Sequence, residues 1–370
     1  MGWTPLHLAC MSGLKEAVEI FVGEEVNICT YDYNDLTPLH LACLHGHKEV
    51  VEILIREKAN IDALTHKNFT PLHWACRNGH KEVVEILMKG KANIDAMAEN
   101  KFAPLHLACE NGHKEVVEIL IKEKANIDAL THKNFTPLHW ACRNGHKEVV
   151  EILIRGKSNI DALTENGFTP LHFACRNGHK EIVKKLIRKK ANIGALTHKN
   201  FTPLHWSCRN GHREIVDILL RKNSNIDALT HRNFTPLHWA CRNGHKEVVD
   251  ILIRGKANID ALAENKFTPL HWACRNGHRE IVEILLRKSS NIDAMTHRNF
   301  TPLHWACRNG HKEVVKILLR EKANIDALTD KNSTPLHWAC RNGHKEVEEI
   351  LIKEKDNIDA STENKFKPLH

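Results

Sequence analysis

The 370-residue sequence lacks a long apolar stretch, a secretion signal and a flexible linker. No run is long enough to cross a bilayer, and the opening Met1-Gly2-Trp3-Thr4 does not begin a signal peptide, so we expect no membrane span and no secretion. No Pro/Gly/Ser-rich segment separates domains. A Gly-rich phosphate loop and a nucleophile elbow are also missing, which removes the motifs of several enzyme classes.

What the chain does contain is one short motif at a constant interval. Thr-Pro-Leu-His recurs every 33 residues, beginning at Thr4, Thr37, Thr70, Thr136, Thr169, Thr202, Thr235, Thr268, Thr301 and Thr334, and the variants Ala103–His106 and Lys367–His370 keep the phase. Such a period marks a repeat array, in which each unit buries its apolar face against its neighbours. We therefore predict a single array over residues 1–370, of about eleven units, with an incomplete unit at the C-terminal end.

Cysteine follows the same period. Eleven of the 12 cysteines share one phase, as Cys76 and Cys109 do. Each repeat therefore holds one cysteine of this row and no second one with which it could form a disulfide. Neighbouring backbones would have to lie within disulfide reach for a bridge to form. The pattern indicates buried, reduced side chains, typical of a cytoplasmic or nuclear protein.

One repeat shows the local structure that the motif predicts. Thr70 suits an N-cap and Pro71 the first helical position, and a short helix then runs to Asn78-Gly79, where glycine can take the left-handed conformation. A second amphipathic helix is predicted over residues 81–88, with one apolar stripe. The polar stretch that follows, over residues 92–102, predicts a β-hairpin-like connection.

These residues resemble the ankyrin repeat. The shared order is x-T-P-L-H-x-A-x-x-x-G-H-x-x-V-V-x-x-L, carried here by Thr70, Pro71, Leu72, His73, Ala75, Gly79, His80, Val83, Val84 and Leu87. The resemblance covers the whole chain. It implies an all-α solenoid of stacked helix-turn-helix units with projecting β-hairpin loops, whose first helices line a concave groove.

The chain departs from the family pattern at fixed positions. Trp replaces the usual Leu in most first helices. The family also has Gly after the second helix, where this chain has Lys58, Lys91, Lys124, Lys157, Lys190, Lys256, Lys322 and Lys355. A non-glycine residue in a left-handed conformation costs about 1 kcal/mol. Asn68 and its copies replace the hairpin glycine and tolerate that conformation better. Ala103 gives up an N-cap and Glu348 puts a charge at a valine position, so we expect weaker local stability at both.

The 28 histidines do not predict a metal site. His73 and Cys76 are repeated in every unit, whereas zinc needs about four converging ligands. We interpret the histidines as structural, hydrogen-bonded to neighbouring hairpins. No cofactor, metal or catalytic residue is predicted, because a catalytic site needs different residues meeting once. Asn68-Phe69-Thr70 matches a glycosylation sequon, but the cap and the turn explain both residues.

The candidate binding residues are the Phe before each Thr and the Arg-Asn before each Gly, which the resemblance places on the concave side. They are Phe69, Arg77, Asn78, Phe135, Arg143, Asn144, Arg176, Phe201, Arg209, Asn210, Phe234, Arg242, Asn243, Phe267, Arg275, Phe300, Arg308 and Arg341. Arg and aromatic residues are enriched at protein hot spots. In the alternative interpretation, each Phe folds over the next repeat and each Arg pairs with a local carboxylate. The Trp row, by contrast, is predicted to pack between repeats.

The predicted function is that of a non-enzymatic scaffold or adaptor, which is monomeric and binds an unidentified protein partner, acidic or repetitive, through the concave face and hairpin tips. Nucleic-acid binding is less favoured, because the net charge is only +8 and acidic tips such as Glu99, Glu165, Glu264 and Glu363 interrupt the basic ones. The chain begins inside a repeat at Trp3 and stops at His370 before another helix pair. This favours, as the alternative, a regulatory or targeting segment of a larger protein such as a channel, a phosphatase regulatory subunit or a host-directed effector.

Overall fold

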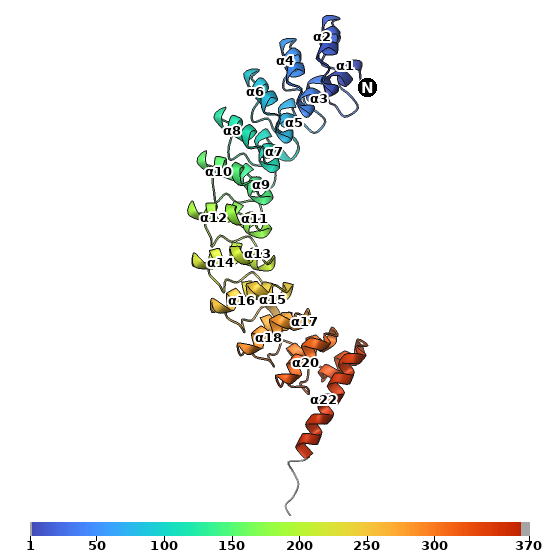
Figure 1. Ribbon diagram of the computed structural model, residues 1–370, viewed down its shortest axis with the longest axis vertical. Coiled ribbons are helices and arrows are strands. Elements are labelled where there is room, and N and C mark those ends of the chain that lie inside the picture. Colours follow the sequence, from blue (N-terminus) through green and yellow to red (C-terminus); the bar gives the residue numbers. More distant parts are fainter. Residues whose placement is uncertain (1, 364–370) are drawn as a thin grey trace, which may run out of the picture. The chain divides into compact units, whose positions relative to one another are not determined.

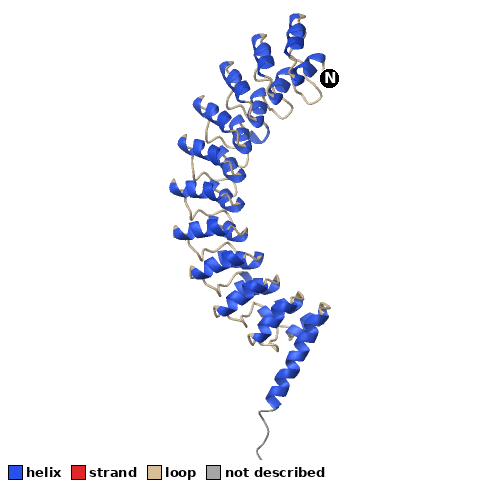
Figure 2. Cartoon of the chain, viewed as in Figure 1, coloured by secondary structure: helices blue, strands red, loops and turns tan. Residues whose placement is uncertain are grey.

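The computed structural model describes residues 2–363. Within them all regular structure is helical, with 22 α-helices and two short 3-10 turns and no strand (Figure 2). The helices form two compact units, Met1–Asn192 and Ile193–His370. The all-α repeat architecture that the sequence predicts is therefore confirmed, while the single array over the whole chain stays a prediction.

Unit 1 contains six helix pairs, each with a first helix that begins at Pro and a second that begins at Lys (Figure 1). The first helices are α1 (Pro5–Ser12), α3 (Pro38–His45), α5 (Pro71–Asn78), α7 (Pro104–Asn111), α9 (Pro137–Asn144) and α11 (Pro170–Asn177). The second helices are α2 (Lys15–Gly23), α4 (Lys48–Arg56), α6 (Lys81–Lys89), α8 (Lys114–Lys122), α10 (Lys147–Arg155) and α12 (Lys180–Arg188). The short turn η1 (Glu99–Lys101) precedes α7.

Unit 2 repeats this plan with five pairs. The first helices are α13 (Pro203–Arg209), α15 (Pro236–Asn243), α17 (Pro269–Arg275), α19 (Pro302–Arg308) and α21 (Pro335–Arg341). The second helices are α14 (Arg213–Arg221), α16 (Lys246–Arg254), α18 (Arg279–Arg287), α20 (Lys312–Arg320) and α22 (Lys345–Glu363), and η2 (Glu264–Lys266) precedes α17. Within each unit first helices pack on first helices and second helices on second helices.

Each first helix is closed at both ends by its own sequence. In α9 the Thr136 hydroxyl accepts the backbone N–H of His139, and Pro137 occupies the first helical position. At the other end Gly145 adopts φ +86° and donates its N–H to Ala141 O. The glycine after α7, Gly112, has a second reason to lack a side chain. A Cβ there would lie 2.5 Å from Nδ1 of His146 in the next repeat.

The signature histidine joins each repeat to the next. His73 Nδ1 accepts the Thr70 N–H at 3.1 Å, and His73 Nε2 donates to Phe102 O of the following repeat at 3.0 Å. His73 is buried together with Leu72 and Cys76 of the same helix. The core therefore lies between successive helix pairs, and each repeat depends on its neighbour for both apolar and polar contacts.

The connections between repeats are turns held by few hydrogen bonds. Thr65 and Phe69 pair once, through Thr65 N–H to Phe69 O at 3.0 Å, and Asn68 adopts φ +57° at the tip. The tips also touch along the stack, since Glu99 donates its N–H to Lys67 O at 2.8 Å and the two side chains form an ion pair at 3.3 Å. These connections are hairpin-like loops that do not extend into strands within the described residues.

Two expectations fail at the last helix pair. Lys91 and six of the other lysines expected after second helices adopt φ of 64–67°, as the missing glycine requires, but Lys355 lies inside α22. Glu363, expected at a loop tip, ends the same helix, which has 19 residues where other second helices have nine. Elsewhere the loop is fixed by hydrogen bonds to the following repeat. In α22 the helix continues instead, so that backbone N–H and C=O groups pair within the helix itself. Pro368 and the motif copy at 367–370 lie outside the described residues.

Candidate functional site

Most of the signature histidines of the first helices and most of the cysteines are buried and have structural roles. His40, His73, His106 and His139 are buried, and burial lowers the pKa of each to about 4, against the opposing effect of hydrogen bonds to backbone carbonyls. All 12 cysteines are free, and burial raises the pKa of the Cys10 thiol to about 12. No cluster of three or more potential metal ligands occurs among residues 2–363. Neutral imidazoles and protonated thiols of this kind serve packing.

The arginines of the first helices lie against the tryptophans. We call the side chains of Trp206, Arg209, Trp239, Arg242, Trp272, Arg275, Trp305, Arg308, Trp338 and Arg341 the Arg–Trp ladder. The Arg242 guanidinium carbon lies 5.3 Å from the Trp239 ring centroid and 4.7 Å from that of Trp272. Arg275 repeats this arrangement at 5.1 and 4.9 Å, and Arg308 at 5.1 Å from both of its rings. Each of these guanidinium groups is held between indoles of successive repeats by cation–π attraction.

The phenylalanines pack on the same indoles. The Phe234 ring lies 5.2 Å from Trp239 and 5.5 Å from Trp272, and Phe267 is 5.1 Å from Trp272 and 5.3 Å from Trp305. Phe234 and Phe300 are 7% exposed. Phe69, Phe135, Phe201 and Phe267 are half-buried. The predicted packing of the Trp row between repeats is confirmed. The Phe rings share in it and present little surface of their own.

The asparagines beside each arginine also connect repeats. Asn243 Nδ2 donates to Arg209 O at 2.6 Å, and Asn144 Nδ2 donates to Glu110 O at 2.7 Å. Asn78 makes the equivalent bond to Leu44 O at 2.9 Å. Asn210 is exposed and closes α13 through its N–H to Trp206 O at 3.1 Å. These amides position the ladder arginines, since they hold the backbone from which the arginines project.

The ladder carries positive charge that its surroundings do not neutralise. Arg242, Arg275, Arg308 and Arg341 form no ion pair with any described carboxylate, unlike Arg287 on the second helix α18, which pairs with Glu283 at 3.4 Å. The pKa of Arg275 is lowered, first by burial and then by repulsion from Arg242 and Arg308. The alternative interpretation of the arginines, pairing with a local carboxylate, does not apply to these four residues.

In unit 1 the same pattern is interrupted. Arg77 lies 5.6 Å from the Trp74 ring and Arg143 5.1 Å from that of Trp140. Between them, Leu107 and Glu110 occupy the Trp and Arg positions, and the next repeat has Phe173 beside Arg176. Consecutive Trp and Arg therefore occur only in unit 2, where Arg209 and Arg341 begin and end the ladder.

A second surface row was not anticipated. Every loop between helix pairs except the first carries a Leu or Met side chain that is 45–57% exposed, namely Leu64, Met97, Leu130 and Leu163 in unit 1 and Leu196, Leu229, Leu262, Met295 and Leu328 in unit 2. We call this the Leu/Met row. The flanking Ala63 and Thr65 are 2% and 8% exposed, so the loop alternates between buried and outward side chains. The recurring Ala-Leu-Thr sequence shows the same alternation of small, large apolar and polar residues, and it could have indicated the outward Leu.

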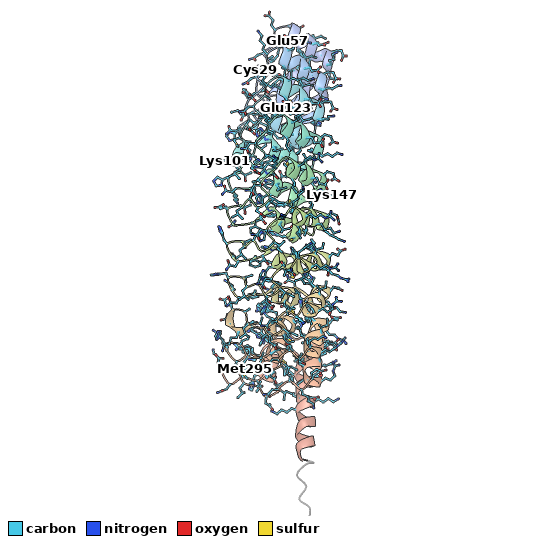
Figure 3. All side chains as sticks on the ribbon, turned by 90° about the vertical axis from the view of Figure 1, so that its left-hand side faces the viewer. Cys29, Glu57, Lys101, Glu123, Lys147 and Met295 are labelled. Atoms are coloured by element: carbon cyan, nitrogen blue, oxygen red, sulfur yellow. The ribbon has the colours of Figure 1, made fainter. Side chains whose placement is uncertain are left out.

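Figure 3 labels one member of the Leu/Met row, Met295, together with charged side chains of unit 1. In unit 2, Met295 reaches the outer margin of the molecule. In unit 1, Lys101 at a loop tip and Lys147 at the start of α10 lie at opposite margins, so the loops and the beginnings of the second helices face different ways. No helix among residues 2–363 combines the length and the apolar character needed to cross a bilayer.

These features define a helical repeat protein whose outward side chains recur once per repeat. A family model described as "Ankyrin repeats (3 copies)" matches residues 6–98, 57–131, 91–163, 154–230, 224–296 and 289–364. The chain belongs to the ankyrin-repeat family. It is similar to the crystal structure of the human ASB11 ankyrin repeat domain, with 29% identity and a TM-score of 0.57 over 60% of this chain and 99% of that one. A comparison with curated proteins gave no match. Ankyrin repeats are generally protein–protein interaction modules.

Proposed function

We propose that the protein is a non-enzymatic scaffold that binds a protein partner through its loops and first helices. The observation that carries this proposal is the Leu/Met row. A Leu or Met side chain about half exposed to solvent recurs in nine successive loops. Apolar groups gathered on a surface are typical of interaction sites.

Two further features support a protein partner. Ladder arginines adjoin aromatic rings, a combination favoured at interface hot spots. The second helices offer a different surface, where exposed charges pair locally, as Lys184 does with Glu181 at 2.8 Å. The free and mostly buried thiols support a reducing compartment, the cytoplasm or nucleus. The role of regulatory or targeting segment in a larger protein remains the second proposal, and it would use the same surface.

The test compares captured proteins between two variants. The first variant removes the Leu/Met row from three repeats of unit 2 and carries Leu229→Lys, Leu262→Lys and Met295→Lys. It should no longer capture the specific partner from a lysate of the source organism. The matched control is Arg254→Glu, Arg287→Glu and Arg320→Glu, at exposed second-helix ends of the same unit. Crosslinking should place the captured protein on the loops. Equal capture by both variants, or crosslinks confined to second helices, would refute the proposal.

A further inference from the structure

We propose that the Arg–Trp ladder of unit 2 binds an extended acidic polypeptide segment that carries a carboxylate side chain at every third residue. This inference rests on the proposed function and specifies the partner of one part of the surface.

The first step of the argument is the orientation that stacking imposes on each guanidinium. Arg242 has an indole on either side, at 5.3 and 4.7 Å. Its planar faces are engaged by these rings, which leaves the N–H edge as the part able to bind a ligand. A planar N–H edge matches a carboxylate in a bidentate arrangement. Because the rings already restrict the side chain, ligand binding costs less conformational entropy than it would for a free surface arginine.

The second step concerns charge. Arg242, Arg275, Arg308 and Arg341 have no carboxylate partner among the described residues, although ion pairs are frequent on the second helices. Arg242 and Arg308 repel the charge on Arg275, and burial removes water from it. A row of like charges that lacks counter-charges within its own fold favours binding of an anionic partner.

The third step is the spacing. Arg209 lies 5.1 Å from the Trp206 centroid and 4.7 Å from the Trp239 centroid, so successive indoles are at most about 10 Å apart, the usual spacing of packed helices. A polyproline II segment is extended, has three residues per turn and rises about 3.1 Å per residue, so every third side chain lies on the same face and is about 9 Å from the last. A carboxylate at every third position can therefore meet successive arginines in register, whereas a block of contiguous carboxylates turns most of its groups away from the arginines and spans fewer of them.

The experiment uses the full chain and two synthetic peptides of equal composition. One is a series of Glu-Pro-Pro triplets, as many as the ladder has arginines, with proline chosen to favour the polyproline II conformation. The other carries the same glutamates in one contiguous block. Fluorescence anisotropy at physiological salt should show the triplet peptide binding at least ~10-fold more tightly, because each bidentate pair adds a charge-assisted hydrogen bond.

A ladder variant should bind the triplet peptide no more tightly than it binds the block peptide. It carries Arg242→Gln, Arg275→Gln and Arg308→Gln. The matched control is Arg254→Gln, Arg287→Gln and Arg320→Gln, which removes equal charge from second-helix ends. Circular dichroism verifies folding of both. A second variant, with lysine in place of the same three arginines, should bind both peptides weakly and without a preference for the triplet spacing, because lysine cannot bind a carboxylate in a bidentate manner.

Equal affinities for the two peptides would overturn the proposal. So would equal losses in the ladder and control variants, or ladder-dependent binding of a thymidine oligonucleotide without any preference between the peptides. A result that refutes the ladder proposal can be distinguished from one that refutes the proposed scaffold function. If the peptides are not distinguished but the Leu/Met-row variant still loses its captured partner, the scaffold function stands and only the ladder assignment is wrong.

Discussion

At the scale of the residue, the signature histidine is fixed in one protonation state. His73 Nδ1 accepts the Thr70 N–H, so the ring proton resides on Nε2, which donates to Phe102 O. A second proton on Nδ1 would face the Thr70 N–H directly. Burial is the main cause of a pKa of about 4 in six described copies, and it outweighs the raising effect of the hydrogen bonds to backbone carbonyls: His40, His73, His106, His139, His238 and His271.

These histidines predict loss of stability in mild acid. Their pKa is lower in the folded chain than the ordinary histidine value of 6.5, so the unfolded chain binds more protons between pH 6.5 and 4. Stability should be complete above pH 6.5 and fall as the pH drops through this window, by at most about 1.4 kcal/mol per pH unit for each histidine. Urea denaturation at pH 7.5, 6 and 5 measures this. Because exposed carboxylates titrate mainly below pH 5, an unchanged midpoint down to pH 5 would contradict the prediction.

Some residue roles could be predicted from the sequence and others could not. Thr70, Pro71 and Gly79 act locally, so their positions alone predict a cap, a first turn and a left-handed end. The pairing of Arg242 with both Trp239 and Trp272 depends on how one helix sits against the next. No spacing within a single repeat contains that information. The Leu/Met row was missed for another reason, since loop leucines are usually buried.

At the scale of the element, the start of α7 lacks one hydrogen bond that the other first helices possess. Ala103 offers no side-chain acceptor to the His106 N–H, although its own N–H still donates to His106 Nδ1 at 3.1 Å. The equivalent Thr136 is 1% exposed and Ala103 is fully buried, so the two positions have matching surroundings.

Ala103→Thr should therefore stabilise the chain by about 1 kcal/mol, the usual contribution of an N-cap hydroxyl. Thr136→Ala in the next repeat serves as the reverse control and should destabilise by a similar amount. Urea midpoints of the three proteins provide the comparison. A midpoint for Ala103→Thr at or below that of the parent would show that the hydroxyl does not fit.

The boundaries of α22 mark the limit of prediction for elements. Its first residues follow the pattern of the other second helices, and its extension through Lys355 to Glu363 does not. The sequence of residues 355–363 nevertheless resembles that of the loops in the other repeats. Residues that resemble those ending the other second helices therefore do not end this one.

At the scale of the whole molecule, a row of aspartates joins the loops of successive repeats. In unit 1 Asp95 Oδ1 accepts the Asn126 N–H at 2.9 Å, and in unit 2 Asp227 does the same for Asn258 at 2.9 Å. The row is interrupted at position 194, where glycine replaces aspartate. The Asn225 N–H, which would be its donor, has no protein acceptor among the described residues.

Gly194→Asp should complete this row and stabilise unit 2 by about 1 kcal/mol, since the new bond joins a charged acceptor to an exposed donor and glycine is also the more flexible residue when unfolded. Gly194→Ala separates the two contributions, because it restricts the unfolded chain without supplying an acceptor. Amide exchange at Asn225 gives the direct readout. Protection that does not increase in Gly194→Asp relative to Gly194→Ala would refute the hydrogen bond.

The contacts between repeats also bear on how such a chain can lengthen. His73, for example, needs the loop of the next repeat, and Asn243 needs a carbonyl of the preceding one. A piece of the gene copied out of phase would leave these groups without partners. A copy of any whole number of 33-residue units regenerates every bond at both junctions. The identical stretches 58–87 and 124–153 are what such copying leaves behind, so a hydrogen-bond pattern that makes a single repeat dependent on its neighbours also makes the array tolerant of duplication.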